Sequence, residues 1–314
     1  MKKYNLKLSI VIPVFNSKDC LGELVKRVDT VLGANVKSYE IIMVNDCSTD
    51  ESWLGIEELS LIYKHLKGIN LRKNFGQDNA IMAGLNYSQG DVIIIMDDDL
   101  QHDPEDIPKL IDGVKKGHDV CYAHFTSKKQ SWPKNFGSWF NGKVANLILK
   151  KPKEIYLSPY KAVRKEVVDE IVKYDGPYPY IDGLIFRITR NITQVVAEHR
   201  KRLAGKGNYN IVRSVRVWLK LATNFSVFPL RIASFLGMLS AGFGFCMALY
   251  FVVMHYYGVD APTGWPSLIV TLLFIGGIQL LTIGIVGEYV GRVFIQQSKG
   301  PQFIVKNVTK SEKE

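Results

Sequence analysis

Three consecutive carboxylates, Asp97, Asp98 and Asp99, follow directly on five apolar residues, Val92 to Met96. The apolar run has the length and composition of a buried β-strand, so the aspartates stand at its carboxyl end. Like charges at the end of a buried strand repel one another and resist desolvation, and the arrangement therefore requires a counter-charge. Side chains two apart on an extended segment point the same way, which directs Asp97 and Asp99 to one point and Asp98 elsewhere.

A hard divalent cation, Mg²⁺ or Mn²⁺, would supply that charge. Such a cation takes oxygen ligands, commonly shares them with substrate phosphates, and can stabilise a departing diphosphate. A solvated acidic loop is the alternative for so short a pattern. An EF-hand is excluded because His102 and Pro108 stand where its loop needs Gly and Glu. No P-loop or GxGxxG motif stands at a strand-to-helix turn, so the sequence does not support an ATPase or a dinucleotide enzyme.

Polar residues also end the neighbouring strands that the sequence predicts. From Leu8 to about Tyr122, short β-rich runs alternate with amphipathic helical stretches. This alternation predicts a βαβ series in a mostly parallel sheet, in which ligands bind beyond the carboxyl ends of the strands. We therefore predict a single crevice to which four strand tips contribute: Asn16-Ser17, Asn45-Asp46, Arg72 to Asn74, and Asp97 to Asp99.

The C-terminal third of the chain has a different solvent preference. Residues 232–254 and 267–287 contain no charged side chain, and each run can cross a hydrocarbon layer of roughly 30 Å. We predict two membrane helices, residues 232–256 and 266–290; a buried core helix is the alternative for either run alone. Basic residues flank both runs but are absent from their connection. The positive-inside rule therefore places both termini and the N-terminal domain in the cytoplasm.

The basic residues of the chain indicate an anionic partner. The net charge is +10 and the sequence pI is about 9.2, which fits either nucleic acid or an anionic membrane surface. Residues 209–231 mix basic side chains with Val, Trp, Leu and Phe in a helix-compatible pattern, which predicts an amphipathic helix along the lipid bilayer. Lipid phosphates account for the charge, so no nucleic-acid partner is needed. The tail, residues 291–314, ends in a segment polar enough to be disordered.

Four segments stand out in order along the chain: "SIVIPVFNS", "MVNDCSTDES", "LRKNFGQDNAIMAGL" and "GDVIIIMDDDLQHDPEDIPKLI". In this order they resemble the family 2 glycosyltransferases. More narrowly, the chain is similar to the polyprenyl-phosphate glycosyltransferases, a group that includes dolichyl-phosphate mannose synthase and bacterial enzymes that charge undecaprenyl phosphate. The resemblance extends over nearly the whole chain. It implies a GT-A nucleotide-sugar-binding α/β fold in residues 1–208, followed by the juxtamembrane amphipathic helix and the two membrane helices.

The resemblance also implies which residues bind the nucleotide. It places the base and ribose against the first two strand tips, where Phe15 can cover a base face and Asp46 can accept a base N–H. Ordinary core packing is the alternative for Phe15. On the diphosphate side, Arg72 can neutralise phosphate and Gly76 permits close backbone approach. The nucleotide-sugar site is thus expected to contain Pro13, Phe15, Val44, Asn45, Asp46, Arg72, Gly76, Asp97, Asp98 and Asp99, with Asp97, Asp99 and Gln101 on the metal.

Further residues are expected on the acceptor side. Lys161 fits the basic position of a family segment, although Pro159 stands in place of the family's acid. Asp182 is a catalytic candidate that would orient the acceptor or the sugar; a helix N-cap is the alternative. The segment "EHRKRLAGKGNYNI" resembles a mobile basic loop of the family, and a solvated loop is the alternative. Its candidates for gripping diphosphate or lipid phosphate, together with Lys161, are Arg200, Arg202 and Lys206.

These expectations combine into one reaction. We predict a metal-dependent, inverting transfer of one sugar from a nucleotide-diphosphate sugar to polyprenyl (undecaprenyl) phosphate at the cytoplasmic membrane face, for cell-envelope glycan or lipid modification. Similarity to bacterial members favours UDP over GDP. A glycan-extending transferase, a nucleotide-sugar hydrolase and a non-catalytic membrane scaffold that senses nucleotide sugars remain as alternatives. The Gly-rich apolar runs favour close helix packing within or between chains, the latter in a homo-oligomer.

Overall fold

The computed structural model describes residues 4–125, 155–197, 228–257, 264–297 and 300–309 of the 314-residue chain. The chain divides into two compact units. One consists of Met1–Asn208 together with Lys299–Glu314, and the other is Tyr209–Ser298. The C-terminal residues thus fold with the N-terminal part of the chain.

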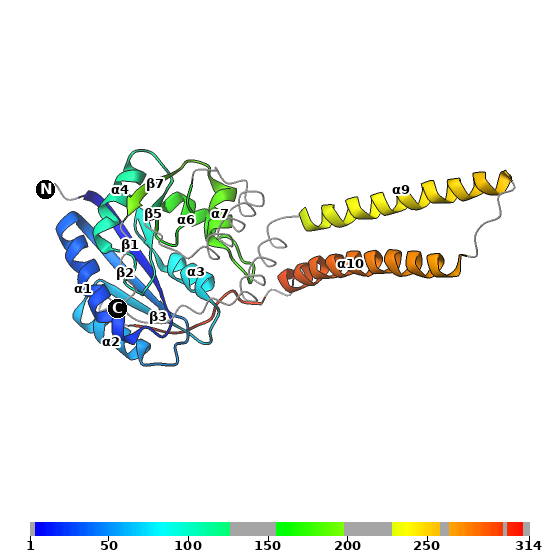
Figure 1. Cartoon of the computed structure of the whole chain (residues 1–314). Coiled ribbons are helices and arrows are strands. Elements are labelled where there is room, and N and C mark those ends of the chain that lie inside the picture. The colour runs from blue at the N-terminus through cyan, green and yellow to red at the C-terminus, as the bar shows by residue number, and fades with distance from the viewer. Residues whose placement is uncertain (1–3, 126–154, 198–227, 258–263, 298–299, 310–314) are drawn as a thin grey trace. The chain divides into compact units, whose positions relative to one another are not determined.

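The first unit is built on an eight-stranded sheet with the order β7-β5-β6-β4-β1-β2-β3-β8 (Figure 1). Four neighbouring pairs are parallel: β1 with β2, β1 with β4, β2 with β3, and β5 with β7. The mostly parallel sheet predicted from the sequence is therefore confirmed. The strands are β1 Tyr4–Val14, β2 Val36–Asn45, β3 Leu66–Leu71, β4 Val92–Ile95, β5 Val120–Phe125, β6 Lys161–Arg164, β7 Ile192–Ala197 and β8 Val305–Val308.

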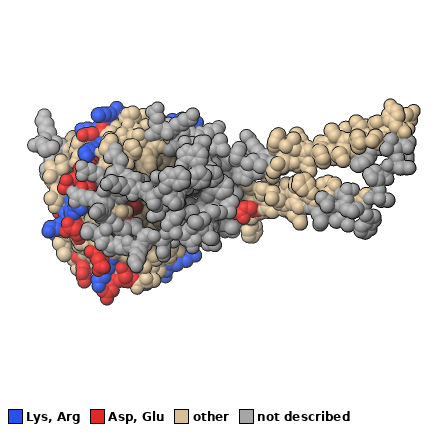
Figure 2. All heavy atoms as spheres, in the orientation of Figure 1, with Lys and Arg blue, Asp and Glu red and all other residues tan. Residues whose placement is uncertain are grey.

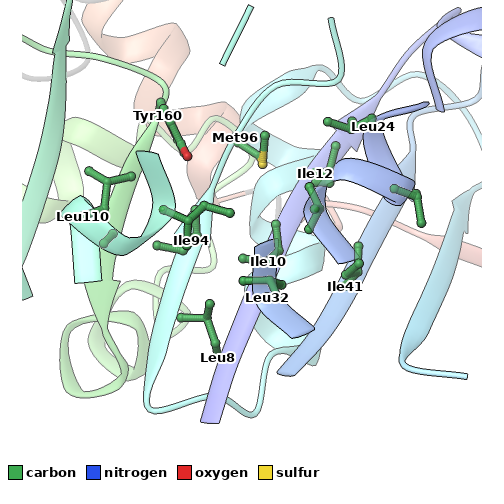
Figure 3. Close-up of a cluster of buried hydrophobic side chains, with 14 of the residues drawn as sticks. Leu8, Ile10, Ile12, Leu24, Leu32, Ile41, Ile94, Met96, Leu110 and Tyr160 are labelled. Carbon is green, nitrogen blue, oxygen red and sulfur yellow. The ribbon is translucent and has the colours of Figure 1, made fainter. Parts of the chain in front are cut away.

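Helices cover both faces of this sheet. One buried cluster joins the sheet to α1, α2 and α4, and a second joins it to α3, α6 and α7. Alternate side chains of β1 supply the two clusters, since Ile10 and Ile12 pack in the first and Val11 in the second. Figure 3 shows the first cluster, with Leu24 and Leu32 of α1 against β1. The helices are α1 Lys18–Asn35, α2 Ser52–Ile62, α3 Gln77–Tyr87, η1 Pro104–Asp106, α4 Ile107–Lys115, α6 Lys165–Ile171 and α7 Ile181–Ile188.

Two strands depart from the simple βαβ series. The short β6 runs antiparallel between β4 and β5, so these two predicted strands are not neighbours. At the other edge, β8 pairs antiparallel with β3, and the Arg72 N–H donates to the Ile304 carbonyl at 2.9 Å (Figure 1). The prediction of a disordered tail is therefore wrong for residues 305–308. Without β8, the edge strand β3 would have unpaired backbone N–H and C=O groups. Hydrogen bonds to these groups stabilise a strand in the tail despite its polar composition.

The second unit contains two long helices, α9 Phe228–Tyr256 and α10 Trp265–Gln297. Both apolar runs are thus helical, and their visible surface in Figure 2 is mostly free of charged side chains. Within the described residues, only Phe274–Gly291 of α10 has the length and mean hydropathy, 1.4, of a membrane span; α9 holds the shorter apolar stretch Ala233–Met247. Two membrane helices stay a prediction. The amphipathic helix expected in residues 209–231 lies outside the described residues, except that its last four residues belong to α9.

Candidate active site

The aspartate triplet lies at the carboxyl end of β4, as the sequence predicts. The side chain of Asp97 is 24% exposed, and its Oδ1 accepts a hydrogen bond of 2.7 Å from the Gln77 side-chain amide. The backbone N–H of Asp97 donates to Nδ1 of His102 at 3.0 Å. Asp99 Oδ1 accepts from the backbone N–H of Gln101 at 3.1 Å, which places Gln101 beside the triplet.

Electrostatics at the triplet favour a bound cation. Burial, followed by the charges of Asp99 and Asp98, raises the pKa of Asp97 to about 7, while Lys161 and Gln77 act in the opposite direction. A divalent cation would relieve this repulsion, and carboxylate oxygens are its preferred ligands. Among the described residues, no group of three or more His, Cys, Asp or Glu side chains could enclose a metal. Asp97 and Asp99 therefore suit a cation that takes its other ligands from phosphate or water.

Asp98 has different hydrogen-bond partners from its neighbours. Its Oδ2 accepts a hydrogen bond of 3.1 Å from the backbone N–H of Phe15, at the tip of β1. Burial raises its pKa, and hydrogen bonds from Ser17 and Phe15 oppose that rise. Asp98 thus ties the end of β4 to the end of β1.

The tips of β2 and β3 form the predicted nucleotide side. The two carboxylate oxygens of Asp46 accept the backbone N–H groups of Phe75 and Gly76 at 2.7 and 2.8 Å. Gly76 has φ of 91°, a conformation that favours glycine, so this residue lets the chain turn back onto Asp46 before α3 begins. Asn45 is also engaged, because its amide donates to Asn70 Oδ1 at 2.8 Å. Both predicted base ligands therefore help to shape the loop, although each Asp46 oxygen keeps a further lone pair.

The other predicted nucleotide residues differ in exposure. Val44 is fully buried in the core, so its side chain does not face a ligand, and Pro13 is buried as well. Phe15 is 48% exposed, and Arg72 is exposed at the end of β3. Core packing, the alternative for Phe15, is therefore wrong. Phe15 and Arg72 are the members of this group whose side chains are open to a ligand.

Lys161 and Asp182 form a buried ion pair near the triplet. Lys161 pairs across the sheet with Ile95, two residues before Asp97, and its Nζ contacts Asp182 Oδ1. The side chains of Lys161 and Asp182 are 4% and 15% exposed, and the Tyr122 hydroxyl donates to the same Asp182 oxygen at 2.9 Å. Because α7 begins at Ile181, the N-cap alternative for Asp182 is wrong.

The start of α3 contributes two residues that the sequence did not single out as site residues. Gln77 contacts Asp97, while Asp78 accepts a backbone hydrogen bond from Ile181 at the start of α7. Burial and the charge of Asp182 raise the pKa of Asp78 to about 6. Gln77 and Asp78 directly follow the turn at Gly76, and this position in the sequence could have indicated that they belong to the site. The predicted phosphate-binding residues Arg200, Arg202 and Lys206 lie outside the described residues.

Comparisons with known proteins bear directly on this site. Residues 9–172, which contain all the strand tips described above, match the profile of glycosyl transferase family 2. The chain belongs to this family. A relative, the undecaprenyl-phosphate 4-deoxy-4-formamido-L-arabinose transferase of Aeromonas hydrophila, is 30% identical over 319 residues, covering 99% of this chain and 97% of the relative. An uncharacterised glycosyltransferase of Bacillus subtilis is 32% identical over 305 residues, covering 96% and 94%.

Solved structures agree with the fold of the first unit. The glucosyl-3-phosphoglycerate synthase of Mycobacterium tuberculosis, in complex with Mn²⁺ and UDP-glucose, superposes with a TM-score of 0.54 at 15% identity. The match covers 70% of this chain and 79% of the synthase. This family 2 glycosyltransferase therefore has a GT-A-like α/β fold, as the resemblance implied.

Proposed function

We propose that this glycosyltransferase transfers a single sugar from a UDP-sugar to polyprenyl phosphate, with inversion at the anomeric carbon and with Mg²⁺ or Mn²⁺. The observation that carries the proposal is the placement of Asp97 and Asp99 at the end of β4, beside the tip of the neighbouring strand β1. The name of the Aeromonas relative supports undecaprenyl phosphate as the acceptor. The Mycobacterium synthase, solved with Mn²⁺ and UDP-glucose, supports the donor class and the metal.

On the donor side, the chain positions a diphosphate and the cation that neutralises it. Asp97 and Asp99 would hold the cation, whose chemistry is to stabilise the charge that develops on the departing diphosphate. Arg72 extends into solvent at the end of β3 and can pair with phosphate oxygens. The exposed ring of Phe15 can lie against the uracil base.

On the acceptor side, the nucleophile is an oxygen of the polyprenyl phosphate. A phosphate monoester has a second pKa of about 6, so it is largely ionised at neutral pH and needs no protein base. Its oxygen forms a bond to the anomeric carbon as the bond from that carbon to the nucleotide diphosphate breaks. Asp182, held by Lys161 and Tyr122, would orient the sugar or the acceptor through hydrogen bonds. Catalysis thus depends on positioning and on charge neutralisation.

Arg200, Arg202 and Lys206 extend this proposal to the lipid phosphate. We propose that they grip the acceptor phosphate or the diphosphate at the cytoplasmic face of the membrane, with both chain termini in the cytoplasm. The basic composition of their segment supports this role. The glycine-rich helices α9 and α10 can also pack against those of a second copy in a homo-oligomer.

The decisive experiment measures lipid-linked sugar. Purified full-length protein in lipid nanodiscs is incubated with undecaprenyl phosphate, a panel of UDP- and GDP-sugars, and Mg²⁺ or Mn²⁺. We expect a lipid-linked product from a UDP-sugar that disappears on addition of EDTA, and none when undecaprenol replaces the phosphate. Release of free sugar without a lipid product would indicate the hydrolase, and binding of a nucleotide sugar without turnover would indicate the scaffold.

A further inference from the structure

His102 lies within the site but has no part in the proposed reaction. Its ring is 4% exposed and lies between two aromatic rings that are nearly parallel to it. The ring centroid of Tyr160 is 5.0 Å away at 14°, and that of Phe125 is 5.7 Å away at 3°. The Tyr160 hydroxyl in turn donates to the Asp103 carbonyl at 2.9 Å. Rings from two other parts of the chain therefore fix the plane of the imidazole.

Both nitrogens of this ring are directed toward Asp97. Nδ1 accepts the Asp97 backbone N–H at 3.0 Å, so Nδ1 carries no proton and the ring is the neutral tautomer with its proton on Nε2. Nε2 lies 3.9 Å from Asp97 Oδ2. The other carboxylate oxygen accepts from Gln77 at 2.7 Å. Asp97 is thus held at its backbone by His102 and at its carboxylate by Gln77, with the imidazole N–H facing the second oxygen.

A carboxylate held in this way is oriented before a cation arrives. Orienting a metal ligand in advance lowers the ordering cost of binding, and loss of such support commonly weakens metal affinity by about 10- to 100-fold. We propose that His102 is a positioning residue that holds Asp97 for the divalent cation, mainly through the hydrogen bond from the Asp97 backbone to Nδ1. This inference rests on the proposed role of Asp97 as a metal ligand.

Three substitutions separate the role of each nitrogen from that of the ring. His102→Phe keeps an aromatic ring between Tyr160 and Phe125 but removes both nitrogens. His102→Asn loses the stacking, yet its amide oxygen stands near the position of Nδ1. His102→Gln places its amide nearer to the position of Nε2. If Nδ1 is decisive, affinity for the cation follows the acceptor at that position and does not follow the aromatic packing.

The test is titration of Mn²⁺ into the metal-free full-length protein, followed by the electron paramagnetic resonance signal of free Mn²⁺. We expect folded His102→Phe to raise the Kd for Mn²⁺ by about tenfold or more. His102→Asn should bind Mn²⁺ more tightly than His102→Gln, although both lose stacking. Tyr160→Phe, which keeps its ring and loses the hydroxyl, is the matched control and should retain wild-type affinity.

Wild-type Mn²⁺ affinity in folded His102→Phe would overturn the inference. If that variant does not fold, equal or reversed affinities of the Asn and Gln variants would overturn it instead. Asp97→Asn distinguishes this failure from failure of the metal site. Loss of Mn²⁺ binding in Asp97→Asn alongside wild-type binding in His102→Phe rejects only the positioning role, whereas unchanged binding in both variants rejects the metal site itself.

Discussion

Asp97, Asp98 and Asp99 share one sequence motif but have different surroundings. Asp97 is held by Gln77 and His102, and Asp98 by the backbone of Phe15. Asp99 accepts a hydrogen bond from the backbone of Gln101. The alternation of side chains along the chain accounts for the separation of Asp98 from the other two. Substitutions at adjacent positions should therefore have very different consequences.

We expect Asp99→Asn to reduce transfer to lipid by at least about a hundredfold, because it removes a negative ligand from the proposed cation. Asp98→Asn is the matched control, since its amide oxygen can still accept from Phe15, and it should stay within about threefold of the wild type. The measurement is the initial rate of lipid-linked sugar formation over a range of Mn²⁺ concentrations. Equal losses in the two folded variants would contradict the unequal roles.

The raised pKa of Asp78 predicts a pH-dependent stability. The ordinary value of this group is 3.8, and the value in the folded chain is about 6. The folded state therefore keeps a proton that the unfolded state loses, so a stability contribution that is complete below about pH 4 is lost as the pH rises through about 6. Asp78→Asn removes the charge but can still accept from Ile181. It should be more stable than the wild type by up to about 3 kcal/mol at neutral pH.

Thermal unfolding of Asp78→Asn and wild type across this pH range measures the effect. The difference in Tm should be small near about pH 4 and should grow until about pH 7. A difference that is independent of pH would show that the substitution acts through packing and does not act through ionisation.

At the level of single residues, the sequence predicted the position of the acidic residues better than that of the residues that contact them. Asp97 and Asp99 are recognisable because carboxylates directly follow an apolar strand. The contact of Gln77 depends on the turn at Gly76. The contacts of His102 depend on aromatic rings from β5 and from the residue before β6, which are distant in sequence. The side chain of Val44, which lies within a matching motif, is packed in the core, and the motif alone does not reveal that burial.

Among the elements, β8 is the one whose sequence gave least warning. This strand has only four residues, of which two are polar. It pairs with β3, which lies near the other end of the sequence. The β-rich runs predicted between Leu8 and Tyr122 form β1 to β5, and most of their residues are apolar. The antiparallel β6 also has only four residues and was not predicted either. Pairing with neighbouring strands determines the conformation of so short a segment more than its own sequence does.

Removal of β8 should expose the edge of β3. We expect a chain that ends at residue 303 to unfold at a lower temperature and to associate more readily, since unpaired strand groups promote edge-to-edge pairing. It should also lose activity, because the Ile304 carbonyl holds the backbone of Arg72. A chain that ends at residue 309 keeps β8 and serves as the control. Thermal unfolding, light scattering and transfer activity of the two truncations provide the measurement, and identical behaviour would contradict a structural role for β8.

On the scale of the whole molecule, the two units differ in the solvent they suit. Lys, Arg, Asp and Glu appear on the visible face of the first unit, whereas the described surface of α9 and α10 is mainly apolar (Figure 2). Phe235, Leu239 and Phe243 on α9 are each more than half exposed. An exposed apolar surface of this kind marks a site of contact with a membrane or with another protein surface. The sequence indicated this difference between the two units, because long runs without charged side chains can be recognised without knowledge of tertiary contacts.

The return of the chain to β3 through β8 also has a topological consequence. Residues before and after the helical unit belong to the same folded body, and a folded body lies on one side of a bilayer. The number of crossings between them must therefore be even. A single crossing by α10, the one helix with a qualifying apolar stretch among the described residues, is incompatible with a formed β8. If α10 crosses, a second segment must cross in the opposite direction, and α9 is the candidate among the described residues.

A reporter enzyme inserted between α9 and α10 should consequently be found on the side of the membrane opposite to reporters at the two termini. Finding all three on one side would mean that neither helix crosses. Because the number of crossings must be even, the pairing of the short edge strand β8 constrains whether α9 crosses the membrane, independently of the hydropathy of α9.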